Sequence, residues 1–70
     1  MKDLKIDKEL EVTGKGTVYV TSLSKNKLHI NDLAIGEKII INGVVREIRN
    51  IEMARNGLGA VVDTVGIIAV

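Results

Sequence analysis

Residues 36–53, GEKIIINGVVREIRNIEM, contain the clearest structural signal in the chain. Asn42 and Gly43 separate two runs rich in β-branched residues, which favour strands. Both residues tolerate positive φ, so the pair predicts a β-hairpin with a two-residue type I′ turn. A turn of this length sets the register of the two strands and places Ile41 opposite Val44.

This register divides the hairpin into two faces. One face is expected to be the core face, and it carries four apolar residues: Ile39, Ile41, Val44 and Ile48. Arg46 falls on the same face, so its charged end must reach past the end of the core or lie at an opening. Beyond Ile48 the apolar pattern slips by one residue, which predicts a bulge near Arg49 and Asn50.

The remaining apolar segments also have the pattern of strands. Residues 4–12, LKIDKELEV, alternate apolar and charged side chains except at Lys8, which predicts a single half-buried strand. The GKG turn follows, and residues 17–23, TVYVTSL, predict a second strand. Residues 60–70, AVVDTVGIIAV, predict one or two closing strands, and we expect the last of them to pair with residues 4–12.

These segments together predict an all-β fold in a single domain, residues 1–70. No stretch has a convincing helical pattern, and glycines mark the turns between five to seven short, mainly antiparallel strands. A small closed or partly open β-barrel is the expected architecture, because closure removes the exposed edges of a flat sheet.

The composition narrows the class of protein further. The chain has no cysteine, which is typical of a reducing compartment, so we expect a cytoplasmic location. Its first residues contain no continuous apolar run of the kind found in signal peptides, and the apolar end is too short to span a bilayer. The formal net charge is only +1, whereas a dedicated nucleic-acid binder is usually more basic.

Four segments resemble, in order, the second-domain β-barrel of translational GTPases of the elongation factor Tu type: VTGKGTVYV, AIGEKIII, IRNIEM and DTVGIIAV. The similarity covers about residues 10–70. Two features differ, since Thr21 and Ser22 lead into a longer loop and Val62 precedes Asp63 where the family often has glycine. No phosphate-binding loop of a GTPase domain is present. The resemblance implies a barrel that docks on RNA, the ribosome or partner domains and is not catalytic.

The residues themselves give no indication of an enzyme, and we expect no cofactor and no metal. His29 is the only histidine, and a nucleophilic triad with Ser22 or Ser24 and Asp32 has no support in the spacing. One histidine without cysteine cannot form a zinc site. Asp32 and Asp63 occur among turn residues, where a carboxylate is expected to cap backbone N–H groups.

Two candidate contact surfaces remain. Ile40 and Val45 lie beside the turn on the face opposite the core, and exposed apolar pairs often contact a partner or form a dimer seam. Alternatively, the long loop of residues 21–32 covers them. Tyr19, the only aromatic residue, is a further candidate contact, or a strand residue whose ring covers apolar surface.

A basic face that binds RNA or the ribosome is the second possibility. Its candidate residues are Lys15, Lys25, Lys27, Arg46, Arg49 and Arg55. They are balanced by nine acidic residues, which favours an ordinary solvated surface over a binding face. The sequence therefore predicts a non-enzymatic binding module that engages a macromolecular partner, and it favours protein, including a second copy of the chain, over RNA.

Overall fold

The computed structural model describes residues 1–55 and 61–70, without the side chains of residues 54–55 and 61–62. Six strands form one sheet, and their bounds are β1 (Lys2–Leu4), β2 (Lys8–Val12), β3 (Gly16–Ser22), β4 (Lys38–Ile41), β5 (Val44–Arg55) and β6 (Val61–Ala69). One short 3₁₀ turn, η1 (Ile30–Asp32), lies between β3 and β4. Within the described ranges, no helix is long and apolar enough to cross a bilayer. The all-β prediction is confirmed.

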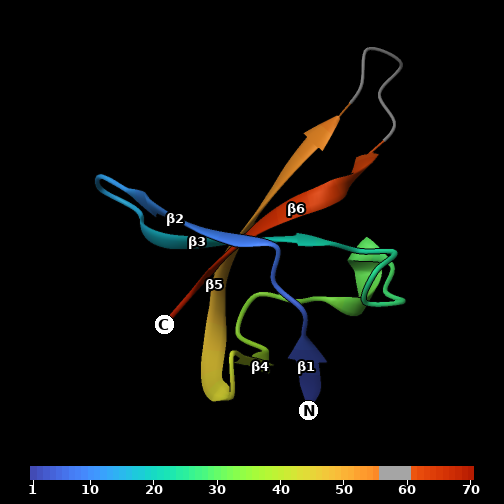
Figure 1. The fold of residues 1–70 in the computed structure, drawn as a ribbon, viewed down its shortest axis with the longest axis horizontal. Coiled ribbons are helices and arrows are strands. Elements are labelled where there is room, and N and C mark those ends of the chain that lie inside the picture. Colours follow the sequence, from blue (N-terminus) through green and yellow to red (C-terminus); the bar gives the residue numbers. More distant parts are fainter. Residues whose placement is uncertain (56–60) are drawn as a thin grey trace.

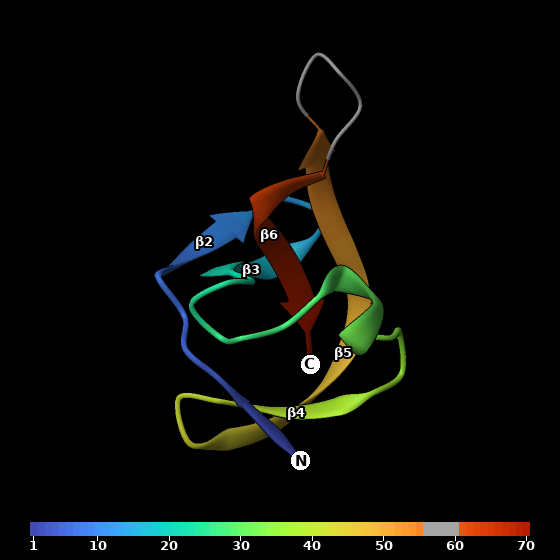
Figure 2. The same cartoon turned by 90° about the vertical axis from the view of Figure 1, so that its right-hand side faces the viewer.

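The strands are arranged in the order β1-β4-β5-β6-β3-β2. Every neighbouring pair is antiparallel except β1 and β4, which run parallel. The sheet is strongly twisted, and the β2–β3 and β5–β6 hairpins extend away from each other (Figure 1). In the orthogonal view, the N-terminus and β4 lie at the bottom of the molecule, and β2 and β3 lie higher (Figure 2).

The sheet is not closed into a barrel. Its two edges are β1 and β2, which are consecutive in the chain and are joined by residues 5–7. The predicted pairing of the last strand with residues 4–12 is wrong, because β6 lies in the middle of the sheet between β5 and β3. An apolar strand of this kind is stabilised by neighbours on both sides, and the charged first strands occupy the edges instead.

The prediction of one half-buried strand over residues 4–12 is also wrong. The regular alternation runs across two strands with opposite environments. Leu4 is buried in the core, whereas Leu10 and Val12 are exposed. The chain turns between them at residues 5–7, so the apolar side chains of β1 and β2 no longer share one face.

The β4–β5 hairpin has the predicted turn and register. Asn42 and Gly43 both have positive φ, 52° and 80°. Ile41 pairs with Val44 and Lys38 with Glu47, as the two-residue loop requires. The predicted bulge is present as well, because the β5–β6 register shifts between Ile48 and Asn50.

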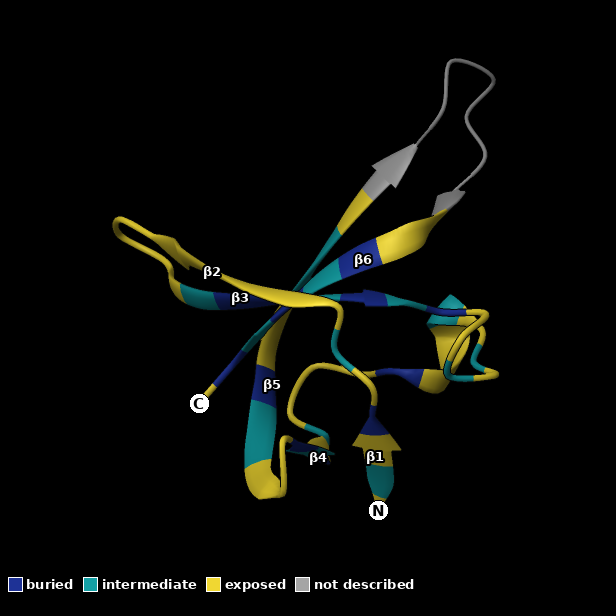
Figure 3. Ribbon diagram, viewed as in Figure 1, coloured by how far each residue is buried: buried dark blue, intermediate teal, exposed yellow. Residues whose placement is uncertain are grey.

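The core lies between the two ends of the twisted sheet. Buried residues occur on β1, β3, β4, β5 and β6, whereas β2 is exposed along its length (Figure 3). The centre of the core is formed by side chains with no exposed surface: Ile39, Ile41, Ile48 and Ile67. The prediction that Val44 belongs to the core is wrong, because its side chain is 48% exposed. On the β5 side of the hairpin, the last strand reaches only Ile48 and Glu47, whereas on the β4 side β1 extends to Ile41, which is buried.

The turn provides a first test of the fold. Gly43→Val is expected to lower the free energy of unfolding by more than about 1 kcal/mol, because a β-branched residue is strained at positive φ. No atom lies within 4 Å of the position of the added Cβ, so backbone strain is the only direct cost. Gly43→Asn is the control, because asparagine tolerates positive φ better than a β-branched residue does. Equal unfolding midpoints for the two variants would contradict a type I′ turn.

Candidate functional site

The hairpin tip, defined here as Ile40, Val44, Val45 and the turn between β4 and β5, is an exposed apolar feature. Val45 is 54% exposed and is paired with Ile40, which is half-buried. Ile40 is also paired on its other side with Asp3 of β1. Val44 and Val45 point to opposite faces of the strand, yet both reach solvent, because they extend beyond the covered part of the hairpin.

The loop of residues 21–32 does not cover the hairpin tip. Its apolar side chains are directed to the core, where Leu23 is buried and Leu28 and Ile30 pack against the cluster. The alternative in which this loop shields Ile40 and Val45 is therefore not the observed arrangement.

Polar groups surround the tip. The Asn42 side chain donates a hydrogen bond of 2.8 Å to the Glu9 carboxylate of β2. Lys38 pairs across the hairpin with Glu47, whose carboxylate also lies 3.6 Å from the Arg49 Nε. An apolar centre with a charged rim is the usual composition of a protein–protein contact.

Tyr19 is not on a contact surface. It is 5% exposed and belongs to the core cluster, so its expected role in partner binding does not fit its position. The single aromatic ring of the chain buries a large apolar area there. Arg46 lies over it, with the guanidinium carbon 5.5 Å from the ring centroid. The guanidinium over the ring face is a cation–π contact, which stabilises the charge of Arg46 on the core face. Among the described residues, the Arg46 Nε is buried and has no hydrogen-bond partner.

Three of the predicted basic residues have acidic partners. The Lys15 Nζ lies 2.5 Å from the Glu52 carboxylate, and the Lys25 Nζ lies 2.6 Å from Asp7. Arg49 is the third, beside Glu47. Exposed ion pairs of this kind add little stability, but they cancel the local positive charge that a phosphate would need.

The other basic candidates do not complete a basic face. Arg46 is half-buried on Tyr19. Lys27 is exposed, at a positive φ of 56°, and borders a different region of the surface. The Arg55 side chain lies outside the described residues.

An open depression of about 530 Å³ lies beside β6. Its lining residues are Leu23, Ser24, Lys27, Leu28, His29, Ile30 and Asp63. The triad of His29, Asp32 and either Ser22 or Ser24 is not assembled. The Asp32 carboxylate instead accepts a hydrogen bond of 2.8 Å from the backbone N–H of His29. In the part of the chain that the structure describes, no group of three or more histidines and carboxylates could hold a metal ion.

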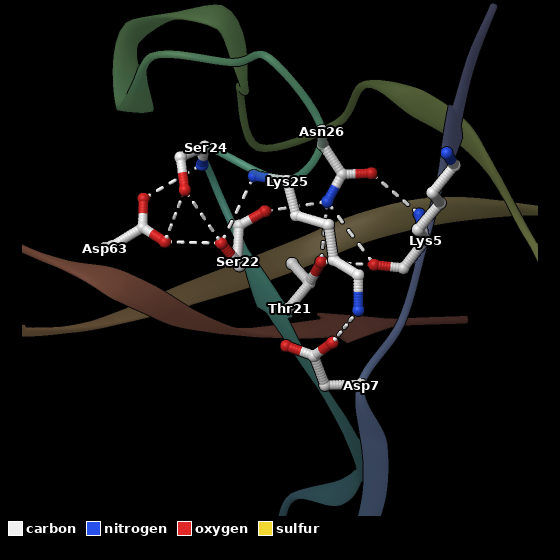
Figure 4. A network of polar contacts seen from close by, with 8 residues as sticks. All are labelled: Lys5, Asp7, Thr21, Ser22, Ser24, Lys25, Asn26 and Asp63. Carbon is white, nitrogen blue, oxygen red and sulfur yellow. Dashed lines mark hydrogen bonds and ion pairs between the residues drawn. The ribbon is translucent and has the colours of Figure 1, made fainter.

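Asp63 caps the loop that follows β3, as expected of an aspartate among turn residues. Its carboxylate accepts hydrogen bonds from the Ser22 hydroxyl, from the Ser24 backbone N–H at 2.8 Å and from the Ser24 hydroxyl at 2.9 Å (Figure 4). These bonds, the one from Ser22 foremost, lower the pKa of Asp63 below its ordinary value of 3.8. The two serines therefore help to hold this loop in place.

The shift of the Asp63 pKa predicts a pH dependence of stability. A carboxyl group whose pKa is lower in the folded state stabilises the fold above the unfolded value of 3.8, and loses this contribution as the pH falls through the folded pKa. Asp63→Asn is therefore expected to be less stable than the unmodified chain at pH 7, with a difference that shrinks below pH 3.8. Urea unfolding at a series of pH values measures this difference.

Asp3→Asn, at an exposed position on β1, is the control and should leave stability at pH 7 unchanged. An Asp63→Asn difference that is constant down to pH 2 would contradict the assignment.

Asn26 holds the connection between the two sheet edges. Its side-chain oxygen accepts a hydrogen bond of 2.7 Å from the Lys5 backbone N–H, and its amide donates to the Thr21 hydroxyl at 2.8 Å (Figure 4). The Thr21 hydroxyl in turn donates to the Lys5 carbonyl. We call these hydrogen bonds of Asn26 the Asn26 clamp. The sequence did not predict it, because its partners are distant in sequence and Asn26 has the character of an ordinary loop residue.

Comparisons with known proteins provide no relative for this arrangement. No protein-family model matches the chain, and no curated protein and no solved structure is significantly similar to it.

Proposed function

We propose that the chain is a non-enzymatic binding module, a partly open β-barrel that docks on a macromolecular partner through the hairpin tip. The partner is protein rather than RNA, and a second copy of the chain is one such partner. The single observation that carries the proposal is the exposure of Val44 and Val45, 48% and 54%, beside a turn of fixed geometry.

Two features of the tip support a docking role. Its two-residue turn presents the aliphatic side chains on a rigid hairpin, so little conformational entropy is lost on binding. Burial of exposed aliphatic surface contributes about 25 cal/mol per Å², whereas solvated charges at a rim contribute little.

The RNA-binding alternative has weaker support. Lys15, Lys25 and Arg49 lie beside carboxylates, and Arg46 packs on Tyr19. A binder that neutralises phosphates needs cations free to replace counterions. The resemblance to the second domain of translational GTPases agrees with a docking role in the cytoplasm and leaves the class of partner open.

The tip variant Ile40→Ser/Val45→Ser tests the proposal. Folding is expected to be nearly intact, because Val45 is exposed and Ile40 is half-buried. Capture of partners from an extract of the source cells, identified by mass spectrometry, should be lost, as should any self-association seen in sedimentation.

Two further variants complete the test. Ile35→Ser makes the same kind of change at a residue that is exposed but lies outside the hairpin, and it should leave capture unchanged. Lys15→Ala/Arg49→Ala should also leave capture unchanged. Loss of capture in the basic variant with retention in the tip variant would favour RNA. A tip variant that is unfolded would show that Ile40 and Val45 are core residues.

A further inference from the structure

The strand β2 is an exposed edge of the sheet. It is hydrogen-bonded to β3 on one side and ends the strand order on the other. All five of its residues are exposed, and the strand is yellow along its whole length in Figure 3. An unpaired strand edge presents backbone N–H and C=O groups that can pair with an added strand.

The two faces of β2 differ sharply in character. Glu9 and Glu11 share one face, and their carboxylates accept hydrogen bonds from Asn42 and Thr17 at 2.8 and 2.9 Å. Both acids are thereby held near the strand, with further acceptor positions open to solvent.

The opposite face of β2 carries Lys8 at its start, followed by the apolar residues Leu10 and Val12. Leu10 is 43% exposed and begins a row that continues through Val18 of β3 to Ile68 of β6. Val12, 37% exposed, lies two residues further along the same face. A strand added beside β2 would extend this row and cover Leu10, provided that it carries an apolar residue opposite it.

Pairing of two copies through this edge is disfavoured by charge. In an antiparallel pair of β2 strands that keeps each face continuous and overlaps by at least three residues, acidic positions oppose each other. The three central registers place Glu9 opposite Glu11, Glu9 opposite Glu9, or Glu11 opposite Glu11. Like charges directly opposite one another destabilise a strand pair. Charge repulsion therefore disfavours pairing of this edge with a second copy of β2, whereas a strand that carries basic residues at the opposed positions avoids this repulsion.

We propose that the β2 edge binds an extended segment of a partner protein in which basic and apolar residues alternate. The basic side chains lie against Glu9 and Glu11, the apolar ones extend the Leu10–Val18–Ile68 row, and backbone hydrogen bonds to β2 join the segment to the sheet. This site adjoins the hairpin tip through the Asn42–Glu9 hydrogen bond, but it does not use Ile40, Val44 or Val45.

A labelled peptide of about seven residues that alternates lysine and valine is the probe. Fluorescence anisotropy should show binding, and NMR hydrogen exchange should show new protection of backbone amides in β2. A peptide that alternates glutamate and valine is the matched control and should not bind. Binding of both peptides, or of neither, would overturn the proposal.

Charge reversal on the protein tests the recognition directly. Glu9→Lys/Glu11→Lys should lower the affinity of the protein for the lysine–valine peptide by about tenfold or more. The same variant should bind the glutamate–valine peptide, which the unmodified chain does not bind. Glu9→Gln/Glu11→Gln keeps the acceptors for Asn42 and Thr17, and it should weaken binding without exchanging the preference. If charge reversal prevents folding, this second variant decides the question. Unchanged affinity in the glutamine variant would overturn the proposal.

Backbone pairing separates strand addition from simple charge attraction. Residues in an added strand alternately face β2 and face solvent, so N-methylation of either the lysine or the valine residues of the peptide should abolish binding, and methylation of the other set should not. Equal binding of the two methylated peptides would contradict strand pairing. The Ile40→Ser/Val45→Ser variant should bind the peptide normally, which distinguishes failure of this site from failure of the hairpin tip.

Discussion

Deletion of residues 67–70 is expected to unfold the domain. Residues 67–69 form the end of β6, which pairs with β5 on one side and β3 on the other, and Val70 follows it. Ile67 has no exposed surface, and Val70 exchanges two backbone hydrogen bonds with Glu47. The deletion removes core volume and leaves two strands without a shared neighbour. Circular dichroism and thermal unfolding measure the effect, and a cooperative transition in the truncated chain would contradict it.

A pair of adjacent substitutions provides the matched control for this deletion. Ile67→Ala removes a fully buried side chain and should cost about 2–5 kcal/mol. Ile68→Ala changes a half-buried side chain on the opposite face and should cost about 1 kcal/mol. Similar costs at the two positions would mean that β6 does not have the assigned core face.

Asn26→Ala is expected to lower the free energy of unfolding by about 2–3 kcal/mol. The Asn26 side chain bonds the Lys5 backbone, the Thr21 hydroxyl and, at 2.7 Å, the Ser22 carbonyl. Alanine removes these hydrogen bonds and releases the connection between β1 and β2. Because those strands are the two edges of the sheet, this connection takes the place of strand pairing between them.

Asn31→Ala is the control for the Asn26 variant. Asn31 is exposed in η1, and in the described residues its side chain makes no hydrogen bond to the rest of the chain. Urea unfolding of the two variants should give a clear loss for Asn26→Ala and no measurable change for Asn31→Ala. Equal midpoints would show that the clamp does not stabilise the sheet.

Local signals in the sequence predicted local structure well. The Asn42-Gly43 turn, the hairpin register and the bulge after Ile48 each depend on a few neighbouring residues, and each is present. Turn chemistry also predicted that Asp63 caps backbone N–H groups. These features follow from φ preferences and from the two-residue period of a strand.

Long-range arrangement could not be predicted in the same way. The alternation from Leu4 to Val12 does not indicate that the chain changes face at residues 5–7. Nor does it indicate that β6, rather than the first strand, occupies the centre of the sheet. Which strands become neighbours depends on the packing of the whole core, and a two-residue period carries no information about it.

Within the candidate site, features that depend on neighbouring residues were predicted, and features that depend on long-range packing were not. The exposure of Val45 follows from its face and its place beside the turn. Tyr19 was misplaced as a contact, because a lone aromatic on a strand has the same pattern on either face. The ion pair between Lys15 and Glu52 joins residues 37 positions apart, so the loss of a free basic face could not be predicted from local sequence.

The salt dependence of partner affinity tests the docking proposal most directly. Affinity for the partner captured by the unmodified chain is measured over a range of salt concentrations. Docking through Ile40 and Val45 predicts a nearly flat dependence, because burial of aliphatic surface releases no counterions. Binding through a basic face predicts a steep fall, about a thousandfold between about 50 and 200 mM salt if six phosphates are contacted. A steep fall that Lys15→Ala/Arg49→Ala flattens would contradict the account.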